Sequence, residues 1–240
     1  MAPIIRLAPR IGLAAASSPG PRRYLGSMES EANSPDQRTK AFDLNRTVAL
    51  SDGIFAFALT LLVLSISVPE ISHSSSSSEL WSALQDREQE MISYLVSFAV
   101  IGSFWVRHHK LCGSLKAVDG AVVSINLVYL ATVAFIPYPT QLLGDFQNSA
   151  AFAVYAAAIS ISMIVSIVLN EQSIRGGLVA TKPSAAELKD RRANGVAVLV
   201  GFIASIPLVL LTDHLWLGYV CWVVGANFHV VLRSGGSGKH

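Results

Sequence analysis

Two charged side chains, Arg46 and Asp52, and a neighbouring hydroxyl, Ser51, stand at the start of a long apolar stretch. A charged group inside a membrane span is costly, so its presence there indicates a specific contact. Arg46 is six residues from Asp52 and projects from a different face of a helix, so we expect the partner of Asp52 on another helix. The candidates are Arg107, His108 and His109. The alternative is that Asp52 lies at headgroup level and only caps or hydrates the helix.

Beyond Asp52 the same stretch carries large apolar side chains at helical spacing. Phe57, Leu61, Leu64 and Val68 follow one another at i, i+4, i+7 and i+11, with Thr60 beside them. On one helix these residues form a single stripe. Such a stripe is typical of core or lipid contact, and in a channel it can line a pore.

The elements that position these residues are membrane spans. Apolar residues make up 52% of the chain and charged residues only 14%, against about a quarter in a soluble domain. Six apolar stretches approach the roughly 20 residues that a helix needs to cross a bilayer. They are 47–68, 91–106, 121–138, 149–169, 195–211 and 215–232. None alternates with the period of two that barrel strands show, so we predict an all-α membrane protein with six transmembrane helices.

The basic residues alternate between the two sides of these predicted spans. Along the chain, Lys and Arg number seven before the first span, then one, three, none, five, none and finally two after the last. This alternation follows the positive-inside rule and predicts that both termini are cytoplasmic. We expect a multi-pass protein of the cell membrane, with an organelle membrane as the alternative.

The chain is expected to have three parts. Residues 1–40 form an N-terminal extension, 41–233 the six-helix domain, and 234–240 a Gly/Ser tail expected to be disordered. The first 28 residues are rich in Arg, Ser and Ala without an acid, which is typical of a transit peptide. A true start at Met28 explains the same composition equally well.

Other chemistries have little support. Cys112 and Cys221 are too few for a disulfide framework or a zinc site. His108 and His109 are adjacent and point about 100° apart on a helix, so we expect no metal there. No nucleotide-binding or hydrolase motif is present. We therefore expect neither an enzyme, a cofactor nor a nucleic-acid partner, and we expect Asn126 to hydrogen-bond between helices.

At this point a family resemblance becomes visible. Residues 46–53 read Arg-x-x-x-Leu-Ser-Asp-Gly, which resembles the Arg-x-x-x-Phe-Ser-Asp signature of the transmembrane protein 175 family of potassium channels. Residues 54–64 and the stretch 104–111, which includes Trp105, also look like that family. The resemblance covers roughly residues 40–232, and its specific motifs lie in the first two predicted spans.

The resemblance implies a homotetramer in the lipid bilayer whose first helix lines a central potassium pore. Apolar side chains would form the constriction, at positions corresponding to Phe57, Leu61 and Leu64, with the hydroxyl of Thr60 contributing to potassium preference. A polar cluster would hold the pore helix against its neighbours. That cluster corresponds to Arg46, Ser51, Asp52, Trp105 and His108. The permeant ion would be K⁺, without any cofactor.

The chain has no Thr-Val-Gly-Tyr-Gly filter and no regularly spaced arginines of a voltage sensor, which fits the resemblance. It departs from the family pattern at two positions. Leu50 stands where the signature has Phe, a mild packing change, and Phe57 stands where the family has a smaller aliphatic residue at the narrowest point, which leaves the pore width and conduction open. Two alternatives stay open: a secondary transporter, which would show internal repeats with broken helices, and a non-conducting scaffold.

Overall fold

The computed structural model describes residues 35–72 and 76–236, and the side chains of residues 44–72 and 76–227. The chain divides into two compact units, Met1–Thr39 and Lys40–His240. Of the first unit, only the opening residues of one helix are described, so the expectations for the extension before them lie outside the described residues. The expected start of the Gly/Ser tail at 234 falls within the last helix, which runs to Gly236.

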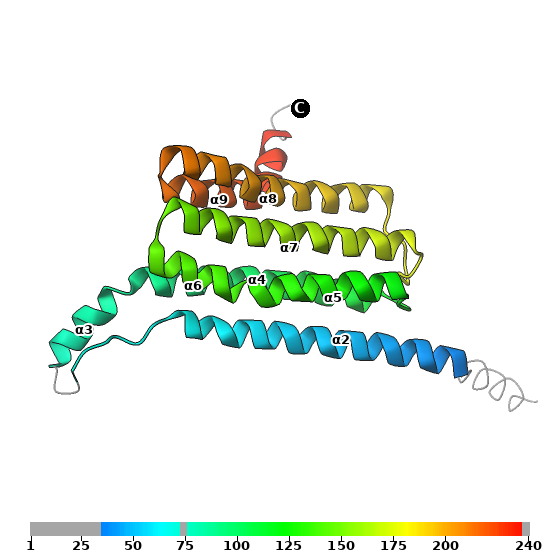
Figure 1. Cartoon of the computed structure of the whole chain (residues 1–240). Helices are drawn as coiled ribbons and strands as arrows, with labels where there is room; N and C mark the ends of the chain where they lie inside the picture. The colour runs from blue at the N-terminus through cyan, green and yellow to red at the C-terminus, as the bar shows by residue number, and fades with distance from the viewer. Residues whose placement is uncertain (1–34, 73–75, 237–240) are drawn as a thin grey trace, which may run out of the picture. The chain divides into compact units, whose positions relative to one another are not determined.

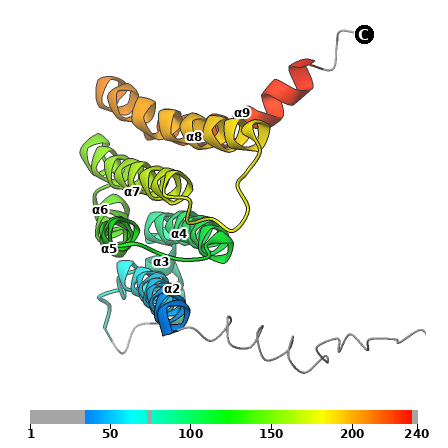
Figure 2. The same cartoon turned by 90° about the vertical axis from the view of Figure 1, so that its right-hand side faces the viewer.

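The described residues form a succession of helices (Figure 1). The helices are α2 (Pro35–Leu61), the 3-10 helix η1 (Leu62–Ser65), α3 (Ser77–Gln85), α4 (Glu88–Ser114), α5 (Gly120–Phe135), α6 (Pro137–Phe146), α7 (Ser149–Arg175), α8 (Ala185–Thr212) and α9 (Leu215–Gly236). From Lys40 on, α2 lies beside α4 and α5; α7 follows, and then the pair α8 and α9 (Figure 2).

Five spans within the described residues are long and apolar enough to cross a membrane. They are Leu44–Ser65, Glu88–Ser114, Gly120–Phe146, Ser149–Arg175 and Ala185–Thr212. The sixth stretch is a shorter apolar helix, Leu215–Asn227, within the residues whose side chains are described. The all-helical class is thus confirmed for the described residues, and five of the six expected spans are long and apolar enough to cross a membrane.

The helices extend further than the apolar stretches, because polar residues start them. Ser184 and Glu187 form a capping box, so α8 begins ten residues before its apolar stretch. Asp119 and Asn148 cap α5 and α7 with their side chains. Pro137 follows the end of α5 and occupies the first turn of α6, so the third span continues beyond the predicted end at residue 138 to Phe146.

Two loops at the ends of α4 and α7 pair with each other. The N–H of Lys116 donates to the carbonyl of Leu178 (2.9 Å), and the N–H of Ala180 donates to the carbonyl of Ser114 (2.8 Å). Gly177 makes the turn that this pairing requires at φ +65°. The pairing ties the connection between α4 and α5 to the loop that follows α7.

Candidate pore helix and its polar contacts

The helix α2 has one buried face and one exposed face. Ser51, Phe55, Ala58 and Leu62 are at most 1% exposed, at spacings of four, three and four residues. This spacing is that of one helical face, and it packs against the rest of the subunit. The packing of this face against the other helices of the same chain therefore fixes the rotation of α2 about its own axis.

The opposite face carries most of the expected pore residues. Phe57 is 57% exposed and Leu64 70% exposed, and Thr60 between them is exposed as well. Leu61 is half-buried at the edge of this stripe. The Thr60 hydroxyl donates to the carbonyl of Phe57 (2.8 Å), which leaves its oxygen lone pairs on the exposed side. Three of the four expected pore residues thus share the exposed face, and Leu61 borders it.

A buried chain of hydrogen bonds joins α2 to two other helices. Asn126 of α5 donates from Nδ2 to Ser51 Oγ (3.1 Å), and its Oδ1 lies 2.8 Å from Nε2 of His108 on α4. Because an amide oxygen only accepts, His108 is protonated at Nε2. Ser51 in turn donates to the carbonyl of Thr47 (2.8 Å). The expectation that Asn126 hydrogen-bonds between helices is confirmed.

Aromatic rings enclose His108. Tyr129 of α5 stacks on it, with ring centroids 5.6 Å apart, and Phe55 of α2 lies at the same distance. The sulfur of Cys112 is 3.5 Å from Nδ1 and 3.8 Å from Nε2 of His108. Nearly equal distances place the sulfur away from the lone-pair axis of either nitrogen, which is poor geometry for sharing a metal. Sequence reasoning missed Phe55 and Tyr129, although Tyr129 lies one turn from Asn126 on α5.

Asp52 has a different partner from the expected basic cluster. Trp105 of α4 donates from Nε1 to Asp52 Oδ1 (2.9 Å). Arg107 instead lies over the ring of Phe104, 5.0 Å from its centroid. The partner is on another helix, as expected, but it is none of the three basic candidates. It is Trp105, which the family resemblance had placed in the same polar cluster as Asp52. The Trp105 ring also packs on His109 (5.3 Å between centroids).

Arg46 lies at the edge of this region, next to Thr47. It is exposed and lines an open hollow with Thr47, Asp119 and Gly120, where α5 begins. The structure thus brings Ser51 and His108 together through Asn126 and joins Asp52 to Trp105. It places Arg46 at the edge of the same region.

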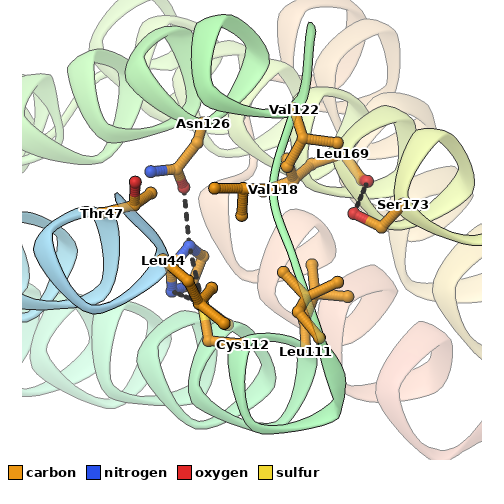
Figure 3. A pocket seen from close by; sticks show the side chains of 11 residues that line it. Leu44, Thr47, Leu111, Cys112, Val118, Val122, Asn126, Leu169 and Ser173 are labelled. Atoms are coloured by element: carbon orange, nitrogen blue, oxygen red, sulfur yellow. Dashed lines mark hydrogen bonds between the residues drawn. The ribbon is translucent and has the colours of Figure 1, made fainter. Parts of the chain in front are cut away.

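A small cavity adjoins the hydrogen-bonded chain. Side chains from α2, α4, α5 and α7 point toward one another around it (Figure 3). Its volume is about 10 Å³, which is room for roughly one water molecule. A hydrated ion does not fit there. Among the residues whose side chains are described, no three His, Cys, Asp or Glu residues gather as a metal site.

Comparison with known proteins gives a consistent result. The family described as "Endosomal/lysosomal potassium channel TMEM175" matches residues 46–137. A potassium channel of Streptomyces collinus is 37% identical over 57% of this chain and 65% of its own length. A potassium channel of Chamaesiphon minutus is 31% identical over 80% of this chain and 95% of its own length.

A solved structure and a vertebrate relative extend the comparison. The crystal structure of a lysosomal potassium-selective channel TMEM175 homolog from Chamaesiphon minutus superposes with a TM-score of 0.61 at 30% identity, covering 80% of this chain and 98% of that one. The human endosomal/lysosomal proton channel TMEM175 is 31% identical, and this chain spans 27% of its length. The chain is therefore an integral membrane protein that belongs to the TMEM175 family.

Proposed function

We propose that this chain is the subunit of a homotetrameric, potassium-permeable channel in which α2 lines the central pore. The observation that carries the proposal is the two-faced character of α2. Its inner face is fixed by Ser51 and Asp52, while Phe57 and Leu64 lie on an exposed apolar face. Two bacterial relatives of this chain are named potassium channels.

The constriction in this proposal is a ring of Phe57 and a ring of Leu64, with Leu61 beside them and the Thr60 hydroxyls between them. Apolar rings strip water from a cation and can close a pore by dewetting. Hydroxyl oxygens between the rings replace part of the lost hydration. Selectivity for K⁺ then arises without backbone carbonyls of a filter loop.

The polar contacts would hold the pore helix in one orientation. Hydrogen bonds between helices are directional, so those of Ser51, Asp52, Trp105 and His108 set which face of α2 points to the pore. In this proposal Arg46 marks the cytoplasmic end of the helix. Six spans with both termini in the cytoplasm follow from the distribution of basic residues.

The test is reconstitution of the purified protein in planar bilayers under a potassium gradient against sodium. We expect unitary currents that reverse near the potassium equilibrium potential. Currents reversing near zero would contradict potassium selectivity. Saturable uptake without unitary currents would instead identify a transporter, and the absence of any flux would identify a scaffold.

A further inference from the structure

Three described helices carry a glutamate at the third position of their first turn, and one of these glutamates makes different contacts from the other two. Glu79 of α3 and Glu187 of α8 each accept from the backbone N–H of their own N-cap serine. Both are exposed capping boxes. Glu90 of α4 is buried, with 9% exposure, and its carboxylate reaches out of its own helix.

The carboxylate of Glu90 joins the end of α2 to the start of α4. Oε2 accepts a hydrogen bond of 2.6 Å from the backbone N–H of Ser67, two residues beyond η1. Oε1 pairs with Nη1 of Arg87 at 2.8 Å. Both oxygens of a buried charge are thus satisfied, and both bonds are of the strong, charge-assisted type.

A third helix packs on the same residue. A Cβ added at Gly144 of α6 would lie 3.2 Å from Glu90 Cα and 3.4 Å from its Cγ. The glycine therefore lets the α6 backbone approach Glu90 closely. Glu90 is the point where the end of α2, the start of α4 and α6 meet.

The segment that follows α2, which Glu90 holds through Ser67, also carries exposed apolar side chains. Leu64 is 70% and Val68 84% exposed. Without a tether, this segment would gain by moving toward the same segments of neighbouring subunits and burying that surface. The bond from Ser67 to Glu90 pulls in the opposite direction, toward the subunit's own α4.

We propose that Glu90 is a positioning residue that tethers the C-terminal end of the pore helix to α4 and α6 and so holds the pore open. This inference rests on the proposed pore role of α2. Release of the tether moves Leu64 and Val68 inward and closes the pore by dewetting. The chemistry of permeation at Phe57 and Thr60 is unchanged.

Four variants test this role by open probability in planar bilayers. Glu90→Ala should lower the open-to-closed ratio about tenfold, as loss of a charge-assisted bond implies. Glu90→Gln keeps the reach to Ser67 and should retain more activity than Glu90→Asp, which keeps the charge but is one methylene shorter. Glu88→Gln, an exposed acid of the same turn, is the matched control and should behave as wild type. Unitary conductance should stay unchanged in all four.

The tether is contradicted by a wild-type open probability in Glu90→Ala, or by a higher open probability in Glu90→Asp than in Glu90→Gln. If Glu90→Ala does not assemble, judged by size-exclusion chromatography, the Gln and Asp pair alone decides. Amide hydrogen exchange at Ser67 gives an independent readout, and it should be faster in Glu90→Asp than in wild type. A wild-type chain without current contradicts the proposed function, whereas unchanged exchange at Ser67 contradicts the tether itself.

Discussion

The helices around α2 and the helices around α9 pack against each other in different ways. In the first group, side-chain hydrogen bonds from Asn126 and Trp105 connect helices. In the second, α8 and α9 approach each other most closely at glycines, since a Cβ at Gly201 would lie 2.7 Å from the carbonyl oxygen of Cys221. One buried side-chain hydrogen bond, from Trp222 Nε1 to Ser205 Oγ (3.0 Å), also joins these two helices. The ring of Trp222 is stacked between Phe152 (4.8 Å) and Phe202 (4.6 Å).

This difference separates orientation from assembly. Hydrogen bonds are directional, so they fix which face of α2 is buried, and glycine contacts fix only how closely two helices approach. We therefore expect substitutions in the α8–α9 group to lower the free energy of unfolding most strongly. Substitutions in the α2 group should leave a folded protein with altered pore behaviour.

The largest effect is expected for Gly218→Ala in the α8–α9 group. The added Cβ would overlap Cζ of Phe152, whose ring is fully buried and stacked on Trp222. Since that ring has no room to move, the free energy of unfolding should fall by about 3 kcal/mol. The measurement is the thermal midpoint of the detergent-solubilised protein.

Gly102→Ala is the matched control for that substitution. Gly102 also lies within a helix, but an added Cβ meets nothing within 4 Å. Alanine is the better helix former, so the midpoint should hold or rise. If both variants kept the wild-type midpoint, close packing would not distinguish the α8–α9 group.

Next in size is Asn126→Ala in the α2 group. This substitution leaves the buried His108 and Ser51 without their shared partner, so the free energy of unfolding should fall by about 2 kcal/mol. We expect an assembled protein with altered open probability, because α2 can then rotate. A protein that fails to assemble would remove the distinction between orientation and assembly.

The control for Asn126→Ala is Ser124→Ala on the same helix. The Ser124 hydroxyl is exposed and bonds only within α5, to the carbonyl of Gly120 (2.8 Å). Its removal should change neither the midpoint nor the currents. A double-mutant cycle of Asn126→Ala with Ser51→Ala should show coupling, since the two side chains touch.

The contrast between the groups also explains what sequence reasoning could reach. Polar residues inside apolar spans stand out, so Ser51, Asp52, Asn126 and His108 are recognisable from the amino-acid sequence alone. Trp105 was reached only through the family resemblance, and its pairing with Asp52, like the stacking of Tyr129, depends on how α4 and α5 approach α2. Which apolar or aromatic residues contact each other cannot be predicted until the packing of these helices is known.

Helix ends and close contacts between helices are harder to predict from the sequence. The capping box at Ser184 is a local signal and could have placed the start of α8. The close glycine contacts of α8 and α9 cannot be predicted in this way. The sequence does not distinguish a helical glycine with empty space around it, such as Gly102, from one in a crowded site, such as Gly218. The tether from Ser67 to Glu90 uses a backbone N–H, which a sequence does not mark at all.

A smaller effect is expected for Trp105→Phe. Phenylalanine keeps a ring against His109 but loses the hydrogen bond to Asp52, which should cost about 1 kcal/mol because the site is partly exposed. The thermal midpoint should fall slightly, and in an Asp52→Ala background the same substitution should have no further effect. Trp216→Phe, at an exposed tryptophan of α9, is the control. Equal shifts with and without Asp52 would contradict the pairing.

The smallest change, and the one that most directly tests the exposed face of α2, is Phe57→Ala. If Phe57 forms a ring around the pore, removing its side chain widens the narrowest point and lowers the barrier to dehydrated ions, so unitary conductance should rise at least about twofold. Phe135→Ala on α5 is the matched control, because Phe135 is 51% exposed against 57% for Phe57 but lies on another helix. Its conductance should equal that of wild type. An unchanged current in Phe57→Ala would remove Phe57 from the pore and leave its exposure to be explained by lipid or subunit contact.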